Sequence, residues 1–178
     1  MTVKKIYFDM DGVLADFGRG VRELAGFQQS GADQDSKTEA EDDAMWAAIR
    51  KVDRFYDRLE PLPKGYELFK AAKEAYPGMV EVLTGIPKPK RGIETAGEDK
   101  KSWAERLLGK DIPVHIVYKE EKKNYCGGKE YFLIDDRRTN IEEWEAAGGS
   151  GIFYEEEKAD VDLIIKQGLG FTGERKGQ

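Results

Sequence analysis

Cysteine and histidine are almost missing from this chain of 178 residues, which has one of each, Cys126 and His115. A single cysteine cannot form an internal disulfide, and its scarcity suits a reducing compartment. Cys126 also lacks the arginine that cysteine phosphatases need six residues later, because Phe132 occupies that position. His115 lies in an apolar run at 114–117, where we expect it to pack within a strand. We therefore expect no zinc site, and a bound metal would be a hard cation held by carboxylates.

Long apolar stretches are missing as well. Hydrophobic residues make up 39% of the chain and charged residues 36%, and the apolar runs are no longer than a strand. The N-terminus lacks the apolar segment of a signal peptide, so we expect a protein of the cytoplasm, its own or a host's, without a membrane partner. The formal net charge of −6 argues against a nucleic-acid polymer as partner, since such binders need a basic face. A small phosphorylated ligand stays compatible, because local lysines can outweigh the average field.

The chain is long enough for one domain with an insertion and too short for two ordinary domains. Strand-like and helix-like hydrophobic patterns alternate along it. We predict strands at 3–8, 79–83, 114–118, 131–134 and 151–154, and helices at 64–75, 98–108, 139–147 and around 161–165. This alternation predicts an α/β fold, a three-layer Rossmann-like parallel sheet with helices on both faces.

One segment interrupts the alternation directly after the first strand. It contains helical patterns at about 20–27 and 44–52, separated by a polar, acidic tract at 28–43. Within this tract, residues 30–36 have the composition of a solvated loop. The chain therefore divides into a core of residues 1–16 and 60–178 and a small helical insertion of residues 17–59.

Polar side chains follow three of the predicted strands. They are Asp9 and Asp11 after the first strand, Thr84 after the second, and Asp135 and Asp136 after the fourth, with Lys122 or Lys123 just beyond the third. Parallel strands bring their carboxyl ends to one edge of the sheet, so these groups should converge. Two carboxylates about 4 Å apart repel by roughly 4 kcal/mol at an effective dielectric of about 20, and a divalent cation would remove that conflict. Mg²⁺ suits an all-oxygen site that also binds a phosphate, so the pattern indicates phosphoryl transfer.

These residues resemble the four signature segments of the haloacid dehalogenase superfamily of phosphatases. Within it, the chain is similar to the 5′(3′)-deoxyribonucleotidase family and its bacterial and phage relatives over residues 5–153. The matching segments are Asp9-Met10-Asp11-Gly12-Val13-Leu14-Ala15-Asp16-Phe17, the run at 55–63, Leu83-Thr84-Gly85, Trp103-Ala104-Glu105 with Gly109, and Leu133-Ile134-Asp135-Asp136-Arg137. The first and last segments together are specific, and the middle ones support them.

The resemblance implies a role for each acid. Asp9 would be the nucleophile that forms an aspartyl-phosphate, and Asp11 the general acid and then the general base. The Asp9 carboxylate, the main-chain carbonyl of Asp11 and either Asp135 or Asp136 would bind Mg²⁺. Thr84, the Gly85 amide and the lysine would then hold the phosphoryl oxygens.

The lysines are assigned by spacing. The family places its lysine about ten residues before the paired acids, whereas Lys123 lies twelve and Lys122 thirteen residues before Asp135, so the spacing slightly favours Lys123. Lys100 matches a further phosphate-binding lysine of the nucleotidases. A surface lysine at the start of a helix is the alternative interpretation of Lys100.

The insertion at 17–59 would be the cap that covers the site and selects the leaving group. Family nucleotidases stack the base on aromatic cap residues, and we expect Phe17 and Trp46 to serve here. The cap is short and Thr84-Gly85-Ile86-Pro87 replaces the more usual Thr-Ser-Pro, which leaves the nucleotide preference open. We expect a Mg²⁺-dependent phosphatase of (deoxy)nucleoside monophosphates. The alternative substrate is another small phosphomonoester, such as a sugar phosphate. The alternative classes are a non-catalytic phosphate-binding protein and a phosphotransferase or mutase.

Overall fold

A computed structural model, which describes residues 2–28 and 37–174, contains one sheet of five parallel strands. The strands are β1 (Lys5–Phe8), β2 (Val80–Gly85), β3 (Val114–Val117), β4 (Tyr131–Asp135) and β5 (Ser150–Phe153). Each coincides with a predicted strand to within two residues at either end. The predicted α/β fold with a parallel sheet is therefore confirmed.

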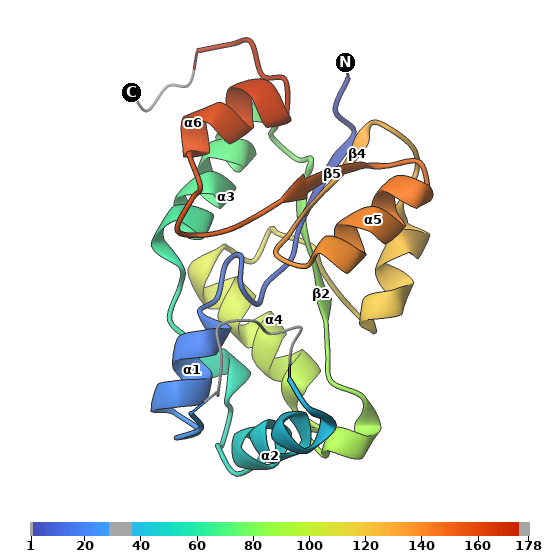
Figure 1. The fold of residues 1–178 in the computed structure, drawn as a ribbon. Helices are drawn as coiled ribbons and strands as arrows, with labels where there is room; N and C mark the ends of the chain where they lie inside the picture. Colours follow the sequence, from blue (N-terminus) through green and yellow to red (C-terminus); the bar gives the residue numbers. More distant parts are fainter. Residues whose placement is uncertain (1, 29–36, 175–178) are drawn as a thin grey trace.

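Helices cover both faces of the sheet (Figure 1). Side chains alternate across a strand, so Ile6 and Phe8 of β1 enter one core cluster and Tyr7 enters another. The first cluster is covered by α3 (Pro63–Ala75), α4 (Ala96–Leu107), α6 (Val161–Leu163) and the π-helical turn η5 (Ile164–Gly168) that extends α6. The second cluster is covered by α5 (Arg138–Ala146) and by the 3₁₀ segment η4 (Lys119–Tyr125).

The strand order, β3-β2-β1-β4-β5, places β1 at the centre of the sheet. From β1 the chain first builds outward through β2 to β3, and then returns to add β4 and β5 on the other side. The switch point therefore lies between β1 and β4, where open α/β sheets bind ligands beyond the strand ends. Because Phe8 pairs with Ile134, the residues that follow them, Asp9 and Asp135, leave the sheet side by side.

The segment after β1 forms α1 (Phe17–Glu23), α2 (Glu39–Arg50) and the 3₁₀ turn η2 (Tyr56–Arg58). Helix α2 begins five residues earlier than predicted because Thr38 and Glu41 form a capping box. Helix α1 begins three residues earlier than predicted because the Asp16 side chain accepts a hydrogen bond from the Arg19 N–H. The loop predicted at 30–36 lies outside the described residues. Figure 1 shows α1 and α2 at the end of the molecule opposite the two chain termini.

The chain leaves and re-enters the sheet-bearing part at neighbouring points. Ala15 forms a bridge with Pro61, and the Leu62 N–H donates to the Leu14 carbonyl at 2.8 Å. Pro63 then starts α3 at a position where its missing N–H costs nothing. The two ends of the intervening segment are thus tied together, as an insertion requires.

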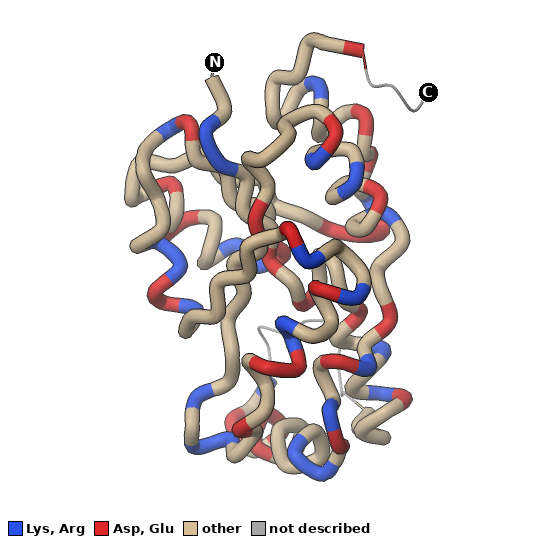
Figure 2. Tube along the Cα trace, turned by 180° about the vertical axis from the view of Figure 1, so that it is seen from behind, with Lys and Arg blue, Asp and Glu red and all other residues tan. Residues whose placement is uncertain are grey.

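Charged residues of both signs are distributed over the whole trace. In Figure 2, acidic and basic positions alternate along the core and along the helices of the inserted segment. In the part of the chain that the structure describes, no helix has the length and apolar character needed to cross a membrane.

Candidate active site

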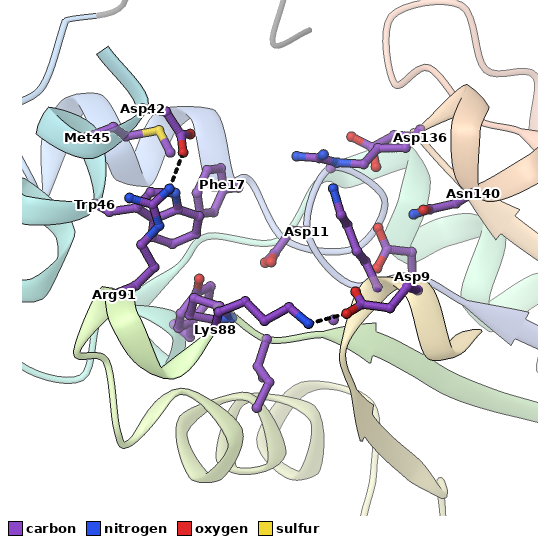
Figure 3. A pocket seen from close by; sticks show the side chains of 18 of the residues that line it. Asp9, Asp11, Phe17, Asp42, Met45, Trp46, Lys88, Arg91, Asp136 and Asn140 are labelled. Atoms are coloured by element: carbon purple, nitrogen blue, oxygen red, sulfur yellow. Dashed lines mark hydrogen bonds and ion pairs between the residues drawn. The ribbon is translucent and has the colours of Figure 1, made fainter. Parts of the chain in front are cut away.

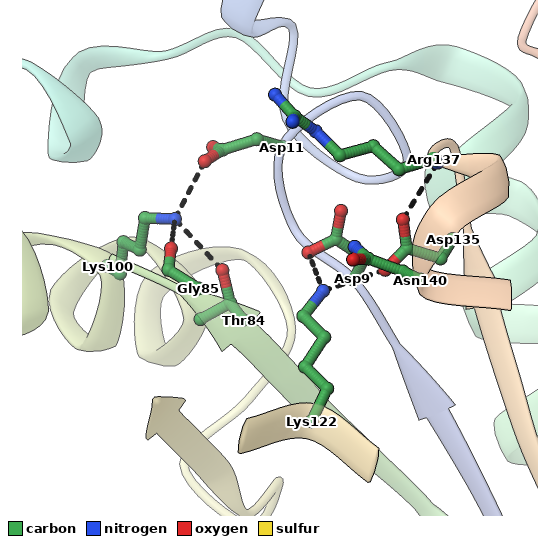
Figure 4. Close-up of polar contacts among 9 residues, drawn as sticks. All are labelled: Asp9, Asp11, Thr84, Gly85, Lys100, Lys122, Asp135, Arg137 and Asn140. Atoms are coloured by element: carbon green, nitrogen blue, oxygen red, sulfur yellow. Dashed lines mark hydrogen bonds and ion pairs between the residues drawn. The ribbon is translucent and has the colours of Figure 1, made fainter. Parts of the chain in front are cut away.

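The acids that follow β1 and β4 come together around a lysine. Asp9, Asp135 and Lys122 are buried, and the Lys122 Nζ donates to Asp9 Oδ1 at 2.8 Å and to Asp135 Oδ2 at 2.7 Å (Figure 4). Asp135 also accepts from the Arg137 N–H at 2.9 Å and from Asn140 Nδ2 at 3.0 Å. Burial works to lower the pKa of Lys122, but the charges of Asp9 and Asp135 outweigh it and raise that pKa. The lysine therefore remains a cation between the two acids.

The structure brings Lys122, and not the slightly favoured Lys123, to the acids. Lys123 is exposed, whereas Lys122 is the lysine that reaches the acids. Both belong to η4, and in a 3₁₀ helix residues three apart share a face. Lys119, Lys122 and Tyr125 therefore point to the same side, which leaves Lys123 turned away. Counting residues from the paired acids could not reveal this, because no helical turn was predicted between the third and fourth strands.

Three carboxylates form a group that could hold a metal ion. Asp9, Asp135 and Asp136 each offer an oxygen, and these oxygens lie within 4.8 Å of one another. Burial, together with the charges of Asp9 and Asp135, raises the pKa of Asp136 to about 8. Gly12 makes room for this acid, since a Cβ at its position would lie 2.0 Å from Asp136 Oδ2. The carboxylates thus repel one another in a way that a bound cation would relieve.

Asp11 is held apart from this group by a different lysine. Lys100 of α4 donates from Nζ to Asp11 Oδ2 at 2.7 Å, to Thr84 Oγ1 at 2.9 Å and to the Gly85 carbonyl at 2.7 Å. Asp11 Oδ1 is buried and has no hydrogen-bond partner among the described residues. Burial raises the pKa of Asp11 and the charge of Lys100 works against that rise. The side chain of Asp11 is therefore outside the carboxylate group named above, and the resemblance assigns only its main-chain carbonyl to the metal.

A cavity of about 310 Å³ opens in front of these acids. Asp9, Asp11, Asp136 and Lys122 line one end of it, and Gly85 lines its wall. Thr84 and Lys100 are fully buried and are not among the described residues that line the cavity. The volume is at the lower end of the range for small-molecule sites.

Aromatic residues line the far end of the cavity. They are Phe17 and Trp46, both predicted; Tyr56 also lines the cavity, but its ring lies 4.6 Å from the Lys100 Nζ that is bonded to Asp11. The ring centroids of Phe17 and Trp46 are 6.2 Å apart, and those of Phe17 and Tyr56 are 6.3 Å apart with nearly parallel planes. Figure 3 shows Phe17 and Trp46 on one side of the cavity and Asp9, Asp136 and Asn140 on the other. The cavity therefore joins an acidic end to an aromatic end.

Several lining residues were not predicted from the sequence. Arg91, in the 3₁₀ turn η3 (Pro89–Arg91), pairs with Asp42 at 2.6 Å and with Asp43, both on α2, and its guanidinium carbon lies 5.9 Å from the centre of the Trp46 ring. Asn140, on the first turn of α5, supports Asp135. The one available signal for Asn140 was its place five residues after Asp135, at the start of a helix. Nothing in the sequence pattern indicated that Arg91 would reach α2.

No protein-family model matches the sequence. A protein of Vibrio phage KVP40 with the provisional name 5′(3′)-deoxyribonucleotidase is 26% identical over 135 residues, which are 76% of this chain and 67% of that protein. A phosphonoacetaldehyde hydrolase-like protein from Oleispira antarctica has a similar structure, with a TM-score of 0.51 and 13% identity over 96% of this chain and 85% of that one. L-2-haloacid dehalogenase from Xanthobacter autotrophicus gives a TM-score of 0.50 and 12% identity over 96% and 84%. The predicted resemblance to the haloacid dehalogenase superfamily is thus confirmed for the fold.

Proposed function

We propose that the protein is a Mg²⁺-dependent phosphatase that hydrolyses a nucleoside monophosphate through a phosphorylated Asp9. The observation that carries the proposal is the arrangement of Asp9, Asp11 and Lys122 at one end of a cavity of ligand size. A nucleophile, a separate acid and a fixed cation are the groups that phosphoryl transfer needs. A protein that only binds phosphate would have no use for two acids with different surroundings.

In the first step, an Asp9 carboxylate oxygen attacks phosphorus and the bond from phosphorus to the ester oxygen breaks. The electron pair of that bond goes to the leaving oxygen, which takes a proton from Asp11. Burial raises the pKa of Asp11, which favours the protonated form that this step requires. The products are the free alcohol and an aspartyl-phosphate on Asp9.

In the second step, water attacks the same phosphorus and gives a proton to the Asp11 carboxylate. The bond between phosphorus and the Asp9 oxygen breaks, which releases inorganic phosphate and restores both acids. Lys122 stays beside Asp9 through both steps and offsets the negative charge on the phosphoryl oxygens. The residues predicted to bind phosphate are Thr84, Gly85, Lys100 and one of Lys122 and Lys123; of these, Gly85 and Lys122 line the cavity.

Mg²⁺ fits the carboxylate group for electrostatic reasons. Asp9 and Asp136 both line the cavity, whereas Asp135 is fully buried behind them and has three hydrogen-bond donors of its own. We therefore assign Asp136 rather than Asp135 as the direct ligand, with Asp9 and the main-chain carbonyl of Asp11. When bound, the ion would neutralise charge on the phosphate and on the acids.

The aromatic end of the cavity supports a nucleoside as the leaving group. Stacking of a base on an aromatic side chain contributes about 1–3 kcal/mol, and Phe17 and Trp46 line that end. A sugar phosphate has no aromatic ring to place there. The name of the phage relative, a 5′(3′)-deoxyribonucleotidase, supports the same substrate class. In this proposal residues 17–59 act as a cap that contacts the base, and residues 1–16 and 60–178 form the catalytic core.

The test is a phosphate-release screen over deoxyribonucleotides, ribonucleotides and sugar phosphates, with and without Mg²⁺. We expect release from nucleoside monophosphates only when Mg²⁺ is present, and a loss of at least about 10³-fold in Asp9→Asn, since the nucleophile is removed. Asp16→Asn, an acid on the same segment that caps α1, serves as the control. Unchanged turnover in Asp9→Asn would overturn the mechanism, and equal rates with sugar phosphates would overturn the substrate class.

A further inference from the structure

We infer that Lys100 is a positioning residue for Asp11 and does not bind the phosphate. This inference rests on the proposed function, because it concerns the group that protonates the leaving oxygen. It departs from the resemblance, which led us to expect Lys100 as a second phosphate-binding lysine. Three observations on the geometry of Lys100 and Asp11 support it.

The first observation is that Lys100 has no donor to spare. A lysine ammonium has three N–H groups, and the Lys100 Nζ has three acceptors within 2.9 Å, one each on Asp11, Thr84 and Gly85. Figure 4 shows these three bonds fanning out from one nitrogen. The nitrogen also lies 4.6 Å from the centre of the Tyr56 ring, which covers it from a further side. A phosphate oxygen could bind only by displacing one of these partners.

The second observation is that Lys100 lies behind the cavity wall. Its side chain is fully buried, and the acid and carbonyl that it holds, Asp11 and Gly85, stand between it and the cavity as lining residues. Lys122 provides the contrast within the same site, since it is also buried and yet lines the cavity. The two lysines therefore differ in access to a substrate.

The third observation concerns the two oxygens of Asp11. Oδ2 is fixed by Lys100, whereas Oδ1 is buried and makes no hydrogen bond with any described residue. A buried carboxyl oxygen is normally paired, so the lack of a partner among the described residues leaves Oδ1 as the oxygen able to carry the transferred proton. Anchoring of one oxygen fixes the direction of the other. Lys100 thus fixes the orientation of the Asp11 carboxyl group, and Asp11 is a residue that lines the cavity.

Leaving groups that differ in acidity separate the two roles of Lys100. A nucleoside alkoxide is a poor leaving group and needs a proton from Asp11, whereas p-nitrophenolate leaves without one. The ratio kcat/KM reports only steps up to formation of the aspartyl-phosphate, so the later water attack does not enter. If Lys100 positions Asp11, its loss should lower kcat/KM for the nucleotide and leave kcat/KM for p-nitrophenyl phosphate nearly unchanged. If Lys100 binds the phosphate, its loss should lower kcat/KM for both substrates.

We expect Lys100→Met to lower kcat/KM for a nucleoside monophosphate by at least about 100-fold and that for p-nitrophenyl phosphate by less than about 10-fold. Asp11→Asn should show the same selectivity, and the double variant should be no worse than Asp11→Asn alone, because both changes remove one function. Lys122→Met is the matched control, a second buried lysine whose loss should harm both substrates. Lys100→Gln, which can still donate to Thr84 and Gly85, replaces Lys100→Met if the latter fails to fold.

A binding measurement decides the question without turnover. Inorganic phosphate is titrated calorimetrically into each protein with Mg²⁺ present, and we expect its affinity to change less than 3-fold in the Lys100 variants and to fall more than 10-fold in Lys122→Met. Equal losses with both esters, or phosphate binding weakened 10-fold in Lys100→Gln, would overturn the positioning role. If the wild-type protein hydrolyses neither ester, the proposed function is wrong. The phosphate titration then still decides whether Lys100 binds the anion. If the wild type also fails to bind phosphate, both proposals fall.

Discussion

Asp136 differs from the other acids of the site because it forms no ion pair with a lysine of residues 2–28 and 37–174. Asp9 and Asp135 share Lys122, and Asp11 is paired with Lys100. Asp136 lies beside Asp9 and Asp135, and burial among these charges raises its pKa to about 8. Between these two pKa values, the ordinary 3.8 and about 8, the folded, metal-free protein keeps a proton on Asp136. The unfolded chain releases that proton in the same pH range. Asp136 therefore lowers the stability of the metal-free protein, and it is the acid that we assign to bind Mg²⁺.

Replacing Asp136 should separate metal binding from folding. In Asp136→Asn we expect the Mg²⁺-induced rise in melting temperature to disappear, while the metal-free protein keeps its stability or gains some. In the wild type that rise should grow between about pH 6 and pH 8, because Mg²⁺ must displace the proton from Asp136. Thermal unfolding with and without Mg²⁺ measures both effects.

Asp135→Asn is the matched comparison, since it changes the neighbouring acid in the same way. Asp135 is fully buried and pairs with Lys122, so its loss should lower the free energy of unfolding by about 2–3 kcal/mol even without metal. The assignment of the two acids would be reversed if Asp135→Asn abolished the Mg²⁺ effect and Asp136→Asn retained it.

Gly12→Ala should displace the Asp136 carboxylate by steric contact. Gly12 has a φ of +81°, and the added Cβ would lie 2.0 Å from Asp136 Oδ2, so the carboxylate must move. We expect weaker Mg²⁺ binding in addition to a backbone cost of about 1–2 kcal/mol. Gly78→Ala is the control, with a φ of +76° and no atom within 4 Å of the added Cβ. Equal Mg²⁺ affinity in both variants would contradict this prediction.

The strands carry a second polar cluster on the face that α5 and η4 cover. Glu81 of β2 is paired with Lys5 of β1 and with His115 of β3, whose Nε2 lies 2.7 Å from Glu81 Oε2. His115 also packs against Tyr7 and Tyr125, with ring centroids 6.0 and 5.0 Å away. The histidine expected to pack within a strand thus has a partner on the adjacent strand. The cluster links three neighbouring strands without involving the cavity.

This cluster should contribute to stability in a pH-dependent way. Burial works to raise the pKa of Glu81, but hydrogen bonds from Lys5 and His115 outweigh it and hold the pKa below 4.5. A depressed carboxyl pKa adds stability that is present above about pH 4.5 and is lost as the pH falls through the folded-state value. The difference in free energy of unfolding between the wild type and Glu81→Gln should therefore shrink from about pH 6 to pH 3. Denaturant titrations at several pH values measure it, and a constant difference would contradict the prediction.

At the scale of the whole molecule, one arginine connects α2 to the turn that follows β2. Arg91 follows β2, and its pairs with Asp42 and Asp43 attach α2 to the sheet-bearing part of the chain. The Arg91 side chain is largely buried, but both aspartates are considerably exposed. Such pairs contribute about 1 kcal/mol or less. Their effect should therefore be on local motion more than on global stability.

Arg91→Ala should loosen α2 without unfolding the protein. We expect faster amide hydrogen exchange in α2, a change of about 1 kcal/mol or less in the free energy of unfolding, and a higher KM for the nucleotide, because Trp46 loses its neighbour. Lys90→Ala, the adjacent cation in the same turn, is the control for charge alone. Identical exchange of α2 in the two variants would show that Arg91 does not hold this helix.

Much of this molecule follows from local patterns in the sequence. Alternating hydrophobic periods are enough to predict five strands and a parallel sheet, because each period is set by the residues of one element. The acids Asp9 and Asp135 were predicted to meet, since parallel strands align their carboxyl ends and both residues follow such strands. Helix starts were predicted less well, because a capping residue such as Thr38 acts through local hydrogen bonds that hydrophobic periodicity does not reveal.

Only the tertiary structure decided how the charged groups pair. The choice of Lys122 over Lys123 depends on the face of a 3₁₀ turn, the bond from Lys100 to Asp11 joins residues 89 positions apart, and Arg91 reaches Asp42 across 49 positions. The sequence alone determined that acids would gather at one edge of a parallel sheet, because backbone geometry enforces it. Which cation holds which acid is set by packing between distant segments, and residue spacing does not record it.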